Sequence, residues 1–170
     1  VYASSKLAGE YIVRNVAERY LLIRTCGLYG TGRTVEKGMA FPELILKKAR
    51  AGDPIQVVDD QIVTPTWTAD LARQIDVMLG ADLEGLVHAS AGGSCSWYEF
   101  ACCVLEMYGT DAAIEPTTSQ AYNSLAKRPA YSVLENARLE NLGLNNMLSW
   151  ADGLSQYLRE KHGVGVLRPS

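Results

Sequence analysis

The stretch YLLIRT, residues 20–25, decides the fold class. It is a short apolar run without alternation, which is typical of a strand buried on both faces of a parallel sheet. Residues 4–19 before it carry apolar side chains at helical spacing and predict an amphipathic helix. A second buried strand is predicted at GLVHASAG, residues 85–92. Because helix and strand alternate along the chain, the sequence predicts an α/β fold with parallel strands.

Several helix ends can also be read from the sequence. MAFPELILKKARAG, residues 39–52, predicts a helix with Pro42 in its first turn and Gly52 at its end. SCSWYEFACCVLEMYG, residues 94–109, begins with Ser96 and Glu99 at the spacing of a capping box. PIQVVDDQIVTPTWT, residues 54–68, is predicted to be extended. Three more helices are predicted at residues 69–80, 135–143 and 148–163, the last of them capped by Ser149 with Asp152 three residues on. An edge strand at 112–119 completes the prediction.

Composition excludes several classes of function. The 170 residues are 48% hydrophobic and 21% charged, as in an ordinary globular protein. The net charge of −3 gives no basic surface for nucleic acid, and no apolar run is long enough to cross a membrane. The N-terminus lacks the features of a signal peptide, so we expect a cytoplasmic protein. The four cysteines show no CxxC spacing, which favours reduced thiols over disulfides or a metal site.

Tyr2 and Lys6 are the first candidates for chemistry. Residues four apart share one face of a helix, so the phenol and the ammonium would project together. A neighbouring ammonium favours the phenolate, and a phenol tuned in this way can protonate a carbonyl oxygen or deprotonate an alcohol. By spacing alone, a solvent-exposed pair without function is the more ordinary explanation, because Tyr and Lys four residues apart are common by chance.

The neighbouring residues indicate a family. YASSKLAGE, residues 2–10, resembles the active-site segment of the short-chain dehydrogenase/reductase family. LLIRTCGLYG resembles the strand and loop over the nicotinamide in the extended branch of that family. Three further segments resemble, in the same order, segments of the dTDP-4-dehydrorhamnose reductases: VVDDQIVTPTWTADLA, GLVHASAGGSCSWYEFA and AKRPAYSVLENARLENLG. The resemblance extends over residues 2–143.

The resemblance implies an activity and a set of site residues. Such enzymes transfer a hydride from NADPH or NADH to the C4 ketone of a dTDP-sugar, giving dTDP-L-rhamnose. By this analogy Tyr2 donates a proton to the C4 oxygen, while Lys6 favours the phenolate and binds the nicotinamide ribose. Thr25 and Cys26 would lie beside the nicotinamide, at the carboxyl end of a buried strand. Cys26 as a simple core residue remains an alternative.

Two further residues are candidates for substrate binding. Arg128, in KRPAYS, is expected to hold the diphosphate, because a guanidinium binds phosphate oxygens in a bidentate manner. Gln61, in DDQIVTPT, is expected to contact the sugar or the base. The alternatives are a surface Lys-Arg pair at residues 127–128 and an ordinary polar strand residue at position 61.

The chain departs from the family pattern in two places. Gly27 occupies a position where the family usually has tryptophan, and this departure leaves the keto-sugar open. The glycine-rich turn for the cofactor pyrophosphate is not found. GLYGTG, residues 27–32, has a different spacing and is interpreted as a pocket loop.

The chain is therefore expected to be the C-terminal part of a Rossmann-type reductase that lacks its nucleotide-binding half and is inactive alone. Residues 1–50 would end the cofactor domain, and residues 51–170 would form mainly the substrate-binding subdomain. The oligomeric state stays open, with a homodimer as one option, and no nucleic-acid or membrane partner is expected. The alternatives are a sugar-nucleotide epimerase or dehydratase of the same fold, and a non-catalytic subunit similar to the regulatory partner of methionine adenosyltransferase.

Overall fold

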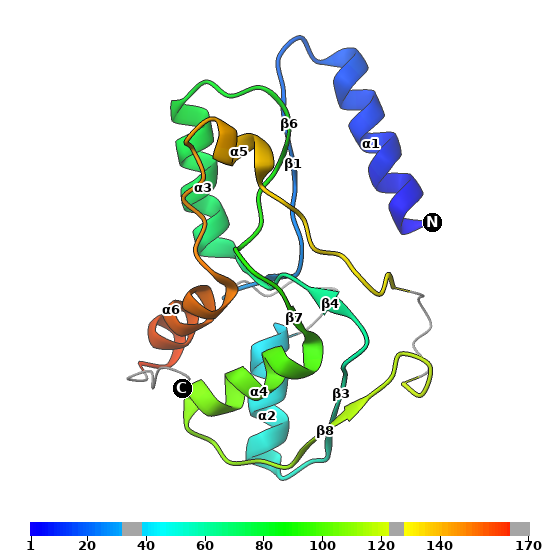
Figure 1. The fold of residues 1–170 in the computed structure, drawn as a ribbon, viewed down its shortest axis with the longest axis vertical. Coiled ribbons are helices and arrows are strands. Elements are labelled where there is room, and N and C mark those ends of the chain that lie inside the picture. Colours follow the sequence, from blue (N-terminus) through cyan, green and yellow to red (C-terminus); the bar gives the residue numbers. More distant parts are fainter. Residues whose placement is uncertain (32–38, 123–127, 164–170) are drawn as a thin grey trace.

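The structure is a computed structural model that describes residues 1–31, 39–122 and 128–163. Helices and strands alternate along most of the chain (Figure 1). In chain order the elements are α1 (Tyr2–Val16), β1 (Leu21–Arg24), β2 (Leu28–Tyr29), α2 (Phe41–Ala51), β3 (Ile55–Val58), β4 (Ile62–Val63), β5 (Thr66–Trp67), α3 (Thr68–Gly80), β6 (Gly85–His88), β7 (Cys95–Ser96), α4 (Trp97–Tyr108), β8 (Ile114–Thr117), α5 (Ala137–Asn141) and α6 (Trp150–His162).

The strands pair mostly in parallel, as the apolar runs predict. β1 pairs with β6, β2 with β5 and β3 with β8, all in parallel, while β4 and β7 are antiparallel. In the first pair Leu21 lies opposite Gly85 and Arg24 opposite His88. The α/β class with parallel strands is thus confirmed.

Two hydrophobic clusters hold the fold together. The larger one joins α2, α4, α6 and β3, with Phe100, Val104, Leu154 and Leu158 fully buried. The smaller one packs α3, β6 and α5 around Met78. In Figure 1 the elements of the smaller cluster lie in the upper half and α2, α4, β3 and β8 in the lower half. Helix α2 and strand β1 both begin before residue 50, but α2 packs with elements that follow this residue and β1 pairs with β6. The division of the chain into a cofactor part and a substrate part at residue 50 stays a prediction.

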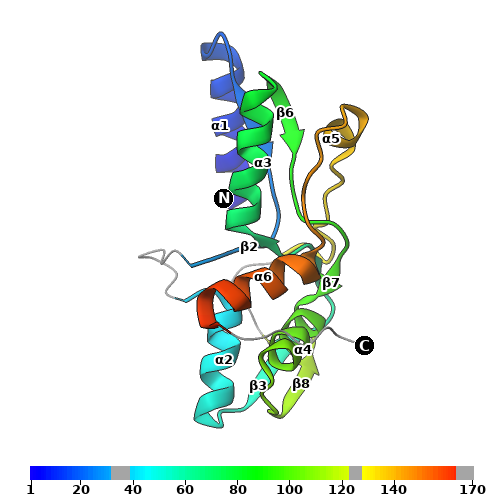
Figure 2. The ribbon, with the colours of Figure 1, turned by 90° about the vertical axis from the view of Figure 1, so that its left-hand side faces the viewer.

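Helix α1 stands apart from both clusters. Figures 1 and 2 show it along one edge of the molecule, with its N-terminal end directed toward the lower half. None of its residues is buried, and Leu7, Tyr11, Ile12 and Val16 all expose their side chains. Among the described residues, an ion pair between Glu10 and Arg24 ties it to β1, with an N···O distance of 2.7 Å. The predicted amphipathic helix exists, but its apolar face is uncovered.

The predicted helix caps are present. Gly52 ends α2 in the left-handed conformation at φ 69°, and Pro42 lies in the first turn of that helix. Ser96 and Glu99 form both hydrogen bonds of the capping box at the start of α4. Ser149 accepts the backbone N–H of Asp152 at the start of α6. None of the described helices is long and apolar enough to cross a bilayer.

Candidate functional site

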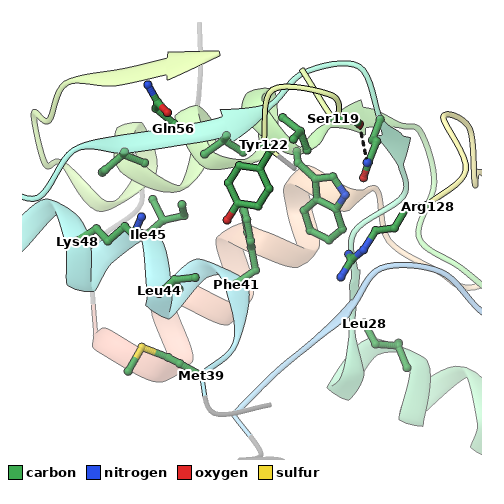
Figure 3. Close-up of a pocket in the computed structure, with 15 residues that line it drawn as sticks. Leu28, Met39, Phe41, Leu44, Ile45, Lys48, Gln56, Ser119, Tyr122 and Arg128 are labelled. Carbon is green, nitrogen blue, oxygen red and sulfur yellow. Dashed lines mark hydrogen bonds between the residues drawn. The ribbon is translucent and has the colours of Figure 1, made fainter. Parts of the chain in front are cut away.

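A pocket of about 420 Å³ opens in the lower half of the molecule. This volume lies within the usual range for small-molecule sites. The pocket lies between α2, β3, the start of α4 and the segment that follows β8 (Figure 3). Its lining residues are Leu28, Met39, Phe41, Leu44, Ile45, Lys48, Ile55, Gln56, Val57, Val58, Gln61, Trp97, Ser119, Tyr122 and Arg128.

The wall of the pocket is built on packed aromatic rings. The Phe41 ring lies 4.8 Å from that of Trp97 and stacks on that of Phe100 at 5.7 Å between centroids. Phe100 is completely buried. Since such ring pairs stabilise a core beyond simple area burial, the pocket wall is held by the larger cluster. The Phe41 and Trp97 rings, inclined at 54° to each other, give the pocket apolar faces against which a planar ring of a ligand can pack.

α2 is also anchored at its first turn. The Glu43 carboxylate accepts a hydrogen bond from the Tyr157 hydroxyl and contacts His162 Nε2, both at 2.8 Å. Partial burial of Glu43 raises its pKa, but the contacts with His162 and Tyr157 outweigh this effect and leave the pKa below its usual value. Because Phe41, Leu44 and Lys48 lie on the same helix, this anchor also fixes one side of the pocket.

Gln61 and Arg128 both line the pocket, so the structure brings the two predicted substrate residues together. Gln61 is 7% exposed, and its Nε2 donates to Ser119 Oγ at 2.7 Å. Arg128 is exposed, and in Figure 3 it lies on the opposite side of the pocket from Lys48. The pocket thus combines apolar walls with an amide and two cations, a lining suited to an anionic ligand that carries a planar ring.

Tyr2 and Lys6 lie together on α1, outside this pocket. The Lys6 Nζ is 5.6 Å from the centroid of the Tyr2 ring, so the expected sharing of one helix face is present. Tyr2 is 73% exposed. Of the described residues that line the pocket, none comes from α1. Their catalytic role stays a prediction.

Thr25 and Cys26 follow the carboxyl end of β1, the edge where ligands of parallel sheets lie. Cys26 is buried, and its Sγ lies 3.6 Å from Ser132 Oγ. The buried Thr25 hydroxyl has no hydrogen-bond partner among the described residues. A buried hydroxyl without a partner is costly, so this atom fits a site that a polar ligand group completes. A nicotinamide amide is such a group, and the fit supports the prediction for Thr25.

The other cysteines carry no site of their own. All four are free, and burial raises the pKa of Cys95 to about 12 and that of Cys103 to about 11. These thiols are therefore protonated at neutral pH. Among the described residues no group of three or more His, Cys, Asp or Glu side chains is arranged to hold a metal ion.

Sequence reasoning missed several lining residues. Helical spacing relates four of them, Phe41, Leu44, Ile45 and Lys48. The sequence therefore did indicate that these four side chains share one face of a helix. The sequence contains no such signal for Ser119, because its hydrogen-bond partner Gln61 is 58 positions away. Tyr122 likewise lies in a segment with no local pattern that points to a pocket.

A comparison with protein families matches nearly the whole chain. The model of the RmlD substrate binding domain matches residues 1–162. The chain belongs to the RmlD substrate-binding domain family.

Individual relatives of this family are reductases or polysaccharide-pathway proteins. The spore coat polysaccharide biosynthesis protein SpsK of Bacillus subtilis is 38% identical over 161 residues, covering 95% of this chain and 54% of that protein. A dTDP-4-dehydrorhamnose reductase of Streptomyces griseus is 36% identical, with 92% and 52% covered. The crystal structure of dTDP-4-dehydrorhamnose reductase from Bacillus anthracis in complex with NADP superposes with a TM-score of 0.88 at 32% identity, covering 94% of this chain and 55% of that one. The chain spans about half the length of these relatives.

Gly27 stands where the resemblance predicted a tryptophan in related proteins. Its φ is 59°, and a Cβ built there would lie 2.6 Å from the carbonyl oxygen of Thr64. The Gly27 carbonyl also accepts the N–H of Thr66, next to the short parallel pair of β2 and β5. A side chain therefore does not fit without a shift of the backbone. Leu28 beside it lines the pocket, but residues 28–29 form strand β2 and residue 32 lies outside the described residues. The interpretation of residues 27–32 as a pocket loop therefore stays a prediction.

Proposed function

We propose that the intact protein is a reductase that uses NADPH or NADH to convert dTDP-4-dehydro-6-deoxy-L-mannose into dTDP-L-rhamnose. The observation that carries the proposal is the pocket, in which Gln61 and Arg128 face apolar walls in a domain of the RmlD family. The relatives that bear the name dTDP-4-dehydrorhamnose reductase support the same substrate class.

In this proposal Tyr2 and Lys6 perform the proton chemistry. A nicotinamide cofactor, when bound, would supply the hydride for C4 of the sugar. Tyr2 gives its phenolic proton to the C4 oxygen, so that the ketone becomes an alcohol and a phenolate remains. The Lys6 ammonium lies 5.6 Å from the ring centroid and supplies a positive charge beside the reacting phenol. Thr25 would hydrogen-bond the nicotinamide amide.

The pocket residues hold the nucleotide part of the substrate. Arg128 places its guanidinium on the diphosphate, where two parallel N–H donors match two oxygens. Phe41 and Trp97 offer apolar faces to the base. Gln61 hydrogen-bonds the edge of the base.

A binding experiment on the 170-residue chain tests the pocket. We expect dTDP to bind, as measured by calorimetry, and Arg128→Ala to weaken binding about tenfold or more, because a charged hydrogen bond to phosphate is lost. Arg14→Ala, on the exposed surface of α1, is the matched control and should leave the affinity unchanged. Equal affinities of the Arg128 variant and the unchanged chain would overturn the assignment of the diphosphate site.

A turnover experiment tests the chemistry. We expect negligible oxidation of NADPH by the 170-residue chain with the dTDP-4-keto-sugar, because its sequence contains no dinucleotide glycine fingerprint. In a protein that joins this chain to a nucleotide-binding half, Tyr2→Phe should lower kcat about 100-fold or more, since general acid catalysis is lost. The affinity for dTDP should not change. Robust turnover by the short chain would contradict the first expectation.

Product analysis separates the related activities. An epimerase of the same fold would return an isomer, and a dehydratase would return a keto-sugar that has lost water, in both cases without net consumption of NADPH. A non-catalytic subunit would bind dTDP or a protein partner with no turnover in any form. A cytoplasmic location and a homodimer remain predictions.

A further inference from the structure

Three side chains form a chain of hydrogen bonds on one wall of the pocket. The Asp60 carboxylate accepts the backbone N–H of Ser119 at 2.9 Å and its hydroxyl at 2.7 Å. Ser119 Oγ in turn accepts from Gln61 Nε2 at 2.7 Å. Gln61 and Ser119 both line the pocket, and Figure 3 marks the bond to Ser119 with a dashed line.

This order of donors and acceptors fixes which way the Gln61 amide points. The side-chain and backbone hydrogen bonds from Ser119 hold the pKa of Asp60 below its usual value, so the carboxylate is ionised at neutral pH. An ionised carboxylate accepts only, and a hydroxyl has a single hydrogen to give. Since that hydrogen goes to Asp60, Ser119 can only accept from the amide. The amide nitrogen must therefore face Ser119, and the carbonyl oxygen must face away from it.

The surrounding loop holds this arrangement in place. Asp59, the residue before Asp60, accepts a hydrogen bond from Ser96 Oγ at 2.5 Å and donates its backbone N–H to the Thr117 carbonyl. Gln61 itself is 7% exposed, which restricts rotation of its side chain. The Gln61 carbonyl oxygen therefore keeps a fixed position in the pocket, and it does not exchange places with the amide nitrogen.

We propose that Asp60 and Ser119 are positioning residues that set the polarity of the Gln61 amide, so that its carbonyl accepts the imide N–H of a thymine or uracil base. The inference rests on the proposed function, because it takes the pocket to hold the base of a dTDP-sugar. Thymine carries a hydrogen on its ring N3, whereas cytosine has a lone pair there. A cytosine base would place two acceptors against each other, and an unpaired buried acceptor costs affinity.

This relay of hydrogen bonds, from Asp60 through Ser119 to Gln61, makes a specific prediction for base selectivity. We expect the unchanged chain to bind dTDP roughly tenfold or more tightly than dCDP, the factor of one lost hydrogen bond. Asp60→Asn supplies an amide that can donate to Ser119 Oγ. The serine hydrogen is then free to turn toward Gln61 Oε1, and the glutamine amide can reverse. The ratio of the two affinities should fall close to one, while binding of the diphosphate through Arg128 is kept.

Three further variants separate the relay from simple loss of structure. Ser119→Ala removes the anchor and should also lower the dTDP-to-dCDP ratio, whereas Ser119→Thr keeps a hydroxyl and should restore it. Asp53→Asn removes an exposed carboxylate outside the pocket and should change nothing. A merely structural role of Asp60 would weaken both nucleotides equally and leave the ratio unchanged. Thermal melts of each variant report on folding.

The outcomes distinguish this inference from the function on which it rests. If neither dTDP nor dCDP binds the unchanged chain, the nucleotide site in the pocket is wrong and the relay falls with it. If dTDP binds but the ratio is unaltered in Asp60→Asn and Ser119→Ala, the relay is overturned and the nucleotide site stands. Should Asp60→Asn fail to fold, the alanine and threonine variants at position 119 decide the question.

Discussion

The pocket and helix α1 hold their functional side chains in different ways. Gln61 and Arg128 belong to a pocket whose wall is continuous with the larger hydrophobic cluster. Tyr2 and Lys6 stand on a helix in which no residue is buried. A helix of this length without packing is marginally stable in water. The proposed nucleotide site is thus supported by a packed core within this chain, whereas the position of the proposed proton donor depends on surface contacts of α1.

Removing a core aromatic ring should produce the largest difference between the two regions. Phe100→Ala is expected to lower the free energy of unfolding by about 3–5 kcal/mol, because the ring is fully buried and touches Phe41, Trp97 and Trp150. Ile12→Ala on α1, where the side chain is 59% exposed, should change it by no more than about 0.5 kcal/mol. Urea unfolding followed by fluorescence measures both. Similar losses would show that α1 packs on the core in solution.

Adding a methyl group to a glycine should have opposite effects in the two regions. Gly27→Ala is expected to destabilise the protein by about 1–3 kcal/mol, because φ is 59° and the new Cβ would meet the Thr64 carbonyl. Gly9→Ala, at a site in α1 with no atom within 4 Å, should stabilise the helix by roughly 0.5–1 kcal/mol. Melting temperatures and far-ultraviolet circular dichroism test the two signs. A stabilising alanine at position 27 would contradict the close approach of the backbone.

Loss of a serine hydroxyl sharpens the comparison further. Ser96→Ala should cost about 1 kcal/mol, because it removes the N-cap of α4 and the contact with Asp59 beside the pocket. Ser5→Ala removes a bond from an exposed hydroxyl to the Tyr2 carbonyl within α1 and should be nearly neutral. Chemical denaturation measures the free energy of unfolding that each variant loses. Binding of dTDP provides a second readout. Equal effects would count against a special role of the capping box.

The smallest expected effect concerns acid stability. The pKa of Glu43 is lowered in the folded state, so its contribution is present above the ordinary value of 4.5 and is lost as the pH falls through the folded pKa. In Glu43→Gln, the free energy of unfolding should therefore fall less steeply as the pH decreases below about 4.5. The pKa of the partly exposed Glu10 is also lowered, mainly by its hydrogen bond with Arg24. Because the Arg24 side chain is 43% exposed and that of His162 only 14%, added salt should weaken the Glu10 effect more than the Glu43 effect, as unfolding at several pH values can show.

The local features of the fold were predictable from the sequence. The non-alternating run at residues 20–25 contains β1, and the predicted caps at Gly52, Ser96 and Ser149 are all present. Each of these depends on residues within a few positions of one another. The sequence also predicted Gln61 and Arg128 as substrate residues through the family resemblance, and the structure places both in one pocket.

Features that depend on distant residues were not predictable. The bond between Gln61 and Ser119 joins positions 58 apart, and no local pattern indicates it. The apolar stripe of α1 predicted burial of one face, yet tertiary packing rather than periodicity decides whether a face is covered. The special geometry of Gly27 likewise depends on the approach of Thr64, which only the folded chain reveals.

The strand pairing has a consequence for how the chain reaches this structure. Gln56 and Glu115 are neighbours across β3 and β8 although they are 59 positions apart in sequence. Parallel strands of this kind cannot start from a tight hairpin, so long loops must close before the first backbone ladder forms. Helices α2 and α4 can form early from local contacts, while the pairing of β3 with β8 waits for that closure. We therefore expect refolding in milliseconds to seconds, with the nucleotide pocket among the last features to appear.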